Sequence, residues 1–339
     1  MIVLLHASAV NQYCNQATCE AVFWNFIYDS ICPSALPALF FISGYLMFKN
    51  YSINGYYNKI KRRVGRLVVP YISWNILFIV IYLIGSIFVP RLSLRVEGFD
   101  LHSLSGVCSK VFSLMTAPID GPLWFIRALF IYSLLSPIIA IFLRNVFSRV
   151  LFVFILLVCA AYFTEIGFSA RLTLTYPVYS LMMFFIGGVM SKTFHEPFAI
   201  FKSIRILFIS VFGLVIIAVS RSIALPALIT GVSDVLSDFF KMVLLVNVAS
   251  LLNTEKMRRS PIYEKLREMS FFAYAGHFLF CSILLHLIAP TLSFLEMGKQ
   301  TFLTAIFFFG GICIMWLVYF PLKKIAPRIL GLFDGTLKL

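Results

Sequence analysis

Charged side chains are scarce in this sequence, and acidic ones are the scarcest. Only 12% of the 339 residues are charged, with 14 acidic against 28 basic residues, while 61% are hydrophobic and the mean hydropathy is +0.95. A soluble domain has about a quarter charged residues and about half apolar ones. The composition therefore excludes an ordinary soluble protein and indicates a polytopic membrane protein whose surroundings are the lipid bilayer.

Several motifs of known chemistry are also missing. The sequence has no helical His-Glu-x-x-His pattern and no zinc-type C-x-x-C pair, so no metal is expected. It has no G-x-S-x-G elbow, no Walker-type loop and no G-x-G-x-x-G after a strand. These absences disfavour soluble hydrolases, ATPases and dehydrogenases. Nucleic-acid binding is disfavoured as well, because the basic residues lie in short loops between apolar runs.

Ten apolar runs approach the ~20 residues that a membrane-crossing helix needs. They lie near 1–13, 33–49, 67–89, 121–143, 147–163, 176–191, 204–220, 235–252, 270–289 and 301–321. The predicted fold is therefore all-α, a membrane helical bundle of about ten transmembrane helices. We expect it to form a single membrane-embedded domain over residues 1–339.

The basic residues predict the orientation of this bundle. If residues 49–66 are cytoplasmic, the five segments on that side hold 20 of the 28 Lys and Arg residues, and the opposite loops hold six. Cationic loops stay on the cytoplasmic side, so both termini are predicted to be cytoplasmic. In the first run only Met1–Val10 precede the polar Asn11, about half a crossing. We therefore expect the first helix to be truncated and the true start to lie upstream.

The seven cysteines divide by predicted location. Cys159, Cys281 and Cys313 lie within predicted spans, and the other four lie in predicted outside loops, namely Cys14, Cys19, Cys32 and Cys108. An oxidising periplasm would allow one or two disulfides among these four. Free thiols are the alternative.

Two histidines lie inside apolar runs, where ionisable groups are costly and are functional candidates by default. His6 ends the run Ile-Val-Leu-Leu-His, and a neutral imidazole there can act as general base and then general acid toward a hydroxyl. His277 follows Tyr274 by three residues, so both share a helix face. Hydrogen bonding within the bundle is the alternative role of either histidine.

Arg63 and Arg66 belong to a basic cluster, Lys-Ile-Lys-Arg-Arg-Val-Gly-Arg at 59–66, between two apolar runs. Residues three apart share one face of a helix. Guanidinium groups bind phosphate with two parallel hydrogen bonds, so this face is a candidate anion site. General attraction to anionic lipid is the alternative.

Two further basic residues, Arg127 and Lys241, fall within predicted spans. We expect Arg127 to pair with Asp120, its nearest acidic neighbour in the sequence. Lys241 has Asp234 and Asp238 on its own helix face. Both cations are therefore interpreted as structural.

Five landmarks occur in one order over nearly the whole chain. They are Val3–His6, the run Pro37-Ala-Leu-Phe-Phe-Ile-Ser-Gly-Tyr-Leu-Met-Phe48, the run Lys61-Arg-Arg-Val-Gly-Arg-Leu-Val-Val-Pro70, Leu123-Trp-Phe-Ile126 leading to Ser136-Pro137, and Tyr274-Ala-Gly-His277. In this order they resemble the acyltransferase-3 family of integral membrane acyltransferases. The phrase Phe-Phe-Ile-Ser-Gly-Tyr, followed by Arg-x-x-Arg at a helix start, is the most specific part.

The resemblance implies an O-acyltransferase of the bacterial inner membrane that moves an acetyl group from cytoplasmic acetyl-CoA to a hydroxyl. The acceptor would be an envelope or exported carbohydrate, or a lipid-linked sugar. His6 would assist acyl transfer, with His277 as a weaker catalytic candidate, and Arg63 and Arg66 would lie near acetyl-CoA. The family also has an arginine eleven positions before its first-helix histidine, and here that position would precede Met1.

Two other interpretations are open from the sequence. A transporter or flippase of a small solute or lipid-linked sugar would explain the cations within spans and the Gly/Pro-interrupted runs. The second interpretation is an inactive family member that serves as a membrane partner of a glycan-synthesis complex.

Overall fold

A computed structural model describes residues 1–88, 111, 120–163, 176–194, 197–220, 226–292 and 298–337. Within these ranges the regular structure is helical and there is no strand, which confirms the prediction of an all-α fold. Six of the described helices are long and apolar enough to cross a membrane. A seventh span results if the bent pair Gly121–Leu134 and Ser136–Phe142 is counted as one. These helices are those of a multi-pass membrane protein.

The six long helices are Cys19–Phe48, Tyr56–Gly85, Val146–Phe163, Leu228–Leu252, Pro261–Leu285 and Lys299–Ile325. This count is lower than the ten expected because some predicted runs form helices that are too short or too polar. Residues 1–13 form the five-residue helix α1 (Ile2–His6) and a 3-10 segment, η1 (Ala7–Tyr13). Helices α11 (Tyr176–Thr193) and α13 (Ile204–Ser220) also fall short of a full apolar span.

Two segments that we expected to be loops are helical. α2 (Cys19–Phe26) starts at Thr18, whose hydroxyl accepts a hydrogen bond from the Ala21 amide at 3.1 Å. It continues through the π-helical turn η2 (Ile27–Ile31) and the 3-10 turn η3 (Cys32–Ser34) into α3 (Ala35–Phe48). The basic stretch likewise forms α4 (Tyr56–Arg63), η4 (Val64–Val68) and α5 (Val69–Phe88). Scattered polar residues interrupt the hydropathy of these helices without stopping their backbone hydrogen bonds.

Cys14, Cys19, Cys32, Cys159, Cys281 and Cys313 all have free thiols. The side chain of Cys32 is buried, and its backbone belongs to the 3-10 turn η3. Cys32 therefore does not lie in the loop that was predicted for it. Cys108 lies outside the described residues.

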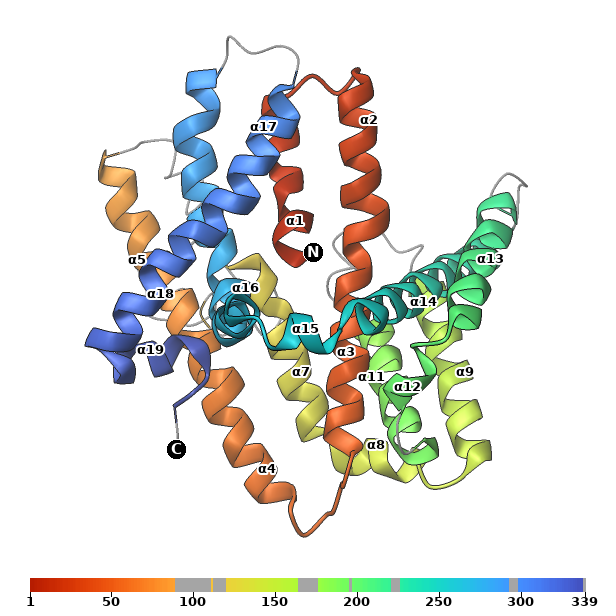
Figure 1. Ribbon diagram of the computed structural model, residues 1–339. Helices are drawn as coiled ribbons and strands as arrows, with labels where there is room; N and C mark the ends of the chain where they lie inside the picture. The colour runs from red at the N-terminus through yellow and green to blue at the C-terminus, as the bar shows by residue number, and fades with distance from the viewer. Residues whose placement is uncertain are drawn as a thin grey trace. The chain divides into compact units, whose positions relative to one another are not determined.

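The chain divides into two compact units, each assembled from separate stretches of sequence. The first contains Met1–Asp29, Lys59–Phe130 and Lys265–Leu339, and the second contains Ser30–Asn58 and Ile131–Glu264. Figure 1 labels the helices of both units.

The second unit is built around a close helix pair. Its helices are α3, α8 (Ser136–Phe142), α9 (Val146–Phe163), α11, α12 (Pro197–Ile200), α13, α14 (Ala227–Leu252) and α15 (Glu255–Arg258). A Cβ at Gly44 of α3 would lie 1.8 Å from the Phe184 carbonyl oxygen of α11, so the two backbones touch. Lys241 Nζ lies 3.3 Å from Asp238 Oδ1 on α14, which confirms the local pairing predicted for Lys241.

The first unit contains the predicted site residues. Its helices are α1, α2, α4, α5, the start of α7 (Trp124–Leu134), most of α16 (Pro261–Ile288), α17 (Lys299–Ala305), α18 (Gly311–Ile325) and α19 (Pro327–Asp334). Ala7 and Val10 are fully buried in one apolar cluster with Cys281 and Leu285 of α16. This packing fixes the short N-terminal helix against α16 although α1 has little stability of its own.

Candidate active site

His6 and His277 come together in the first unit. Their ring centroids are 5.1 Å apart, and Phe278 meets His6 edge-on at 5.4 Å. The packing described above causes this approach, because Cys281 and Leu285 lie one and two turns beyond His277 on the same face of α16. The two histidines that the sequence singled out therefore form a pair, which no local pattern indicated.

The hydrogen bonds of His277 assign its tautomer. Its Nδ1 lies 2.5 Å from the carbonyl oxygen of Tyr274, and a carbonyl only accepts, so Nδ1–H must donate. In the neutral ring Nε2 then carries a lone pair, and Nε2 is buried with no hydrogen-bond partner among the described residues. His277 thus presents a buried acceptor of fixed orientation beside His6, which a purely structural hydrogen bond would not require.

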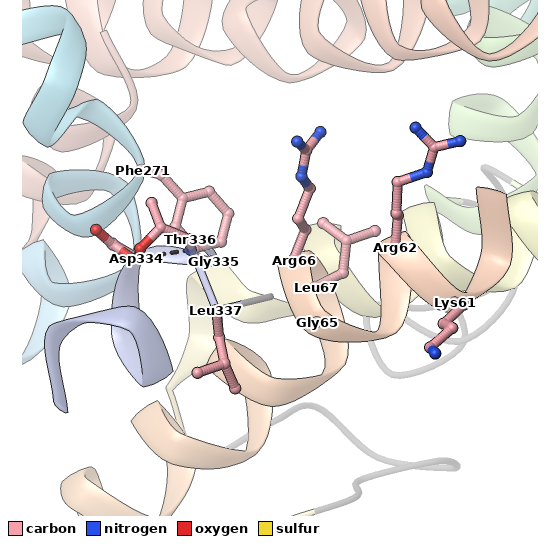
Figure 2. Close-up of a pocket in the computed structure, with 10 residues that line it drawn as sticks. All are labelled: Lys61, Arg62, Gly65, Arg66, Leu67, Phe271, Asp334, Gly335, Thr336 and Leu337. Atoms are coloured by element: carbon pink, nitrogen blue, oxygen red, sulfur yellow. Dashed lines mark hydrogen bonds between the residues drawn. The ribbon is translucent and has the colours of Figure 1, made fainter. Parts of the chain in front are cut away.

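A cationic pocket lies in the same unit, with a cavity volume of about 760 Å³ (Figure 2). Its lining consists of Lys61, Arg62, Gly65, Arg66, Leu67, Phe271, Asp334, Gly335, Thr336 and Leu337. The lining contains three cations and one carboxylate, so the pocket suits an anion. Its size is that of a small-molecule site.

The arginine beside Arg66 in this pocket is Arg62, and Arg63 is not part of the lining. Figure 2 shows the Arg62 and Arg66 side chains extending in one direction, with Lys61 turned away from them. Residues three and four apart both share one face of an α-helix, so Arg62 and Arg63 can each neighbour Arg66. The π-helical turn η4, with its i to i+5 hydrogen bonds, favours the spacing of four.

A row of rings on α16 connects the cationic pocket with the histidine pair. Phe271, which lines the pocket, has its ring centroid 6.4 Å from that of Tyr274. Tyr274 lies 6.2 Å from His277, which in turn lies 5.1 Å from His6. The three α16 residues are spaced by three, so they follow one side of the helix. A chain of ring contacts along one side of α16 therefore runs from the pocket lining to the histidine pair.

Asp120 does not pair with Arg127, contrary to our expectation. Both carboxylate oxygens are buried and have no hydrogen-bond partner among the described residues. The backbone amide of Asp120 donates to the side-chain oxygen of Asn75 at 3.3 Å, and the hydroxyl of Tyr274 donates to the Pro122 carbonyl at 2.5 Å. Asp120 precedes the apolar segment that begins at Gly121, and burial raises the pKa of its carboxyl well above the usual range.

Sequence reasoning missed two groups of this region. Arg62 belongs to the same basic cluster as Arg63, and its spacing of four from Arg66 is the signal that could have identified it. Asp334 and Thr336 line the pocket from α19 and the residues that follow it, where no sequence pattern indicated a site.

Comparison with known proteins agrees with the resemblance found in the sequence. The acyltransferase-3 family, described as an acyltransferase domain, matches residues 1–322 and so extends over stretches of both units. A 125-residue segment is 26% identical to the succinoglycan biosynthesis protein ExoH of Rhizobium meliloti (strain 1021). That segment covers 34% of this chain and 31% of the relative, so the match spans about a third of the relative's length. No solved structure matches the chain. The chain belongs to the acyltransferase-3 family.

Proposed function

We propose that this protein is an O-acyltransferase of the bacterial inner membrane that transfers an acetyl group from acetyl-CoA to a hydroxyl of an envelope or exported carbohydrate. The partial similarity to a succinoglycan biosynthesis protein supports a polysaccharide or its lipid-linked precursor as the acceptor. Family membership favours this enzyme over the transporter or flippase interpretation.

The observation that carries the proposal is the row of rings from the pocket to the histidines. Acetyl-CoA has an anionic nucleotide at one end and a reactive thioester at the other, joined by a long flexible arm. Arg62 and Arg66 line the pocket at one end of the row, and His6 and His277 form the other end. One region of the first unit thus offers phosphate ligands and acid–base groups to the two ends of one donor.

The histidine pair can manage the proton of the reaction. His6 accepts the proton of the acceptor hydroxyl while its oxygen bonds to the acetyl carbon, and the carbon–sulfur bond breaks. The lone pair of His277 Nε2, 5.1 Å away between ring centroids, favours the imidazolium that forms on His6. The proton then returns from His6 to the departing sulfur. All atoms balance in this scheme: one ester and one thiol form from one thioester and one hydroxyl.

The histidine roles are tested by acetyl transfer from labelled acetyl-CoA to envelope glycans in membranes that contain the full chain. We expect His6→Ala to lower the transfer rate about 10²- to 10⁴-fold without weakening donor binding. His277→Leu should lower the rate less, because it removes only the stabilising acceptor. Tyr274→Phe is the matched control: it keeps the backbone carbonyl that holds His277 and should keep most of the activity. Full transfer by His6→Ala would exclude the role of His6.

The donor site is tested by the KM for acetyl-CoA. Arg66→Ala should raise this KM about tenfold or more, because it removes a charged partner of phosphate. Lys61→Ala should raise it less than about threefold, since its side chain turns away from the arginines. Arg62→Ala should have a larger effect than Arg63→Ala. Equal, small effects of all four substitutions would indicate general attraction instead of a site.

A further inference from the structure

Residues 334–337 form part of the lining of the cationic pocket and lie beyond the part of the chain that matches the family. Trp74 of α5 anchors this segment: its Nε1 donates to the Phe333 carbonyl at 2.9 Å, and the two rings lie 5.2 Å apart. Gly335 follows with φ +73°, and a Cβ there would lie 2.7 Å from the Arg66 carbonyl oxygen. The segment is therefore seated directly on the backbone of Arg66.

Asp334 and Arg66 line one pocket with opposite charges, yet no ion pair joins them in the described part of the chain. The Asp334 carboxylate makes a local turn instead. Its Oδ1 accepts from the Thr336 amide at 2.9 Å and from the Thr336 hydroxyl at 2.7 Å, as Figure 2 indicates. Two donors on one oxygen hold the carboxylate in this turn.

We propose that Thr336 is a positioning residue of the donor pocket: by holding the Asp334 carboxylate in a local turn, it keeps Arg66 available for the phosphates of an anionic ligand. The inference rests on the proposed function, which assigns that ligand to the coenzyme A class. Without the hydroxyl of Thr336, only the Thr336 amide still donates to this carboxylate, so the carboxylate is held less firmly and can turn toward Arg66 more often and neutralise it. The ligand then competes with an internal anion for the guanidinium.

The test is a double-mutant cycle read out by binding of coenzyme A to the purified full chain in detergent. Thr336→Val removes the hydroxyl donor, and we expect it to weaken binding about three- to tenfold. In the Asp334→Asn background the same substitution should change binding less than about twofold, because no charge is left to compete. Thr336→Ser retains the hydroxyl and should bind like the parent protein.

Asp334→Asn alone gives a second, independent arm. The amide oxygen still accepts from Thr336, while the negative charge is removed from the pocket. We expect coenzyme A to bind about threefold more tightly at low salt, and the gain to shrink at high salt. If Thr336→Val does not fold, the Asp334→Asn variant still tests the proposal. Unchanged or weaker binding of coenzyme A by Asp334→Asn overturns it.

The outcomes separate this inference from the proposed function. If Arg66→Ala leaves coenzyme A binding unchanged, the donor site itself is wrong. If Arg66→Ala weakens binding but Thr336→Val has no effect, only the role of Thr336 is overturned. The proposal is also overturned if Thr336→Val weakens coenzyme A binding equally in the parent protein and in the Asp334→Asn variant. Thr336 would then have only a structural role, because the loss would not depend on the charge of Asp334.

Discussion

At the scale of single residues, Asp120 is the clearest case of chemistry that burial creates. Its side chain is fully buried, yet neither oxygen has a hydrogen-bond partner in the described part of the chain. An ionised carboxylate in such a place is unfavourable, so the neutral acid is the preferred form.

We predict that Asp120→Asn stabilises the protein at neutral pH. Because the folded-state pKa of Asp120 is raised above its usual value of 3.8, the folded protein binds more protons than the unfolded chain above that pH. The unfolding free energy of the parent protein should therefore fall, relative to Asp120→Asn, as pH rises from about 4 to 7. Thermal unfolding in detergent across this range measures the difference. A constant difference, or a less stable Asp120→Asn at pH 7, contradicts the prediction.

At the scale of helices, the pocket contains a different pair of arginines from the predicted one. The sequence predicted Arg63 with Arg66, and the pocket is lined by Arg62 and Arg66. Both pairs can share one face of a helix, because residues three and four apart are neighbours. The π turn Val64–Val68, with its i to i+5 hydrogen bonds, favours the spacing of four.

The close contact between helices α3 and α11 leads to a second prediction at this scale. Gly44→Ala should lower the stability by about 3 kcal/mol or more, because its Cβ would meet the Phe184 carbonyl at 1.8 Å and the α3 and α11 backbones would have to separate. Gly55→Ala is the matched control, since its Cβ has only an ordinary contact at 3.7 Å with Ser52. Thermal unfolding of both variants in detergent gives the comparison, and similar values would refute the close contact.

At the scale of the whole molecule, the all-α membrane fold is confirmed, and six or seven spans are found among the described residues where the sequence suggested about ten in the full chain. Runs of apolar residues identify helices well, because every backbone polar group in a bilayer must be satisfied within its own helix. The number of apolar runs is a poorer guide to the number of membrane-crossing helices. Residues 1–13 are apolar enough to suggest a crossing, yet they form a short helix and a 3-10 segment that pack on α16.

The orientation of the molecule remains a prediction, and it can be tested at residue 55. Gly55→Cys should react with a membrane-impermeant maleimide only when the cytoplasmic side is exposed, because the basic segment around it is retained there. Peptide mass spectrometry reads the label at that position. Labelling of intact cells at residue 55 would reverse the topology and remove the donor pocket from the side where acetyl-CoA is found.

The sequence by itself determined the class of this protein, its helical content and its family, because hydropathy, helical period and the order of short motifs are local properties. Tertiary structure alone decided that His6 meets His277 and that residues 334–337 line one pocket with Arg62 and Arg66. Each of these depends on how elements far apart in the sequence pack. Such contacts are chosen by the fit of side chains in three dimensions, which the order of residues does not display.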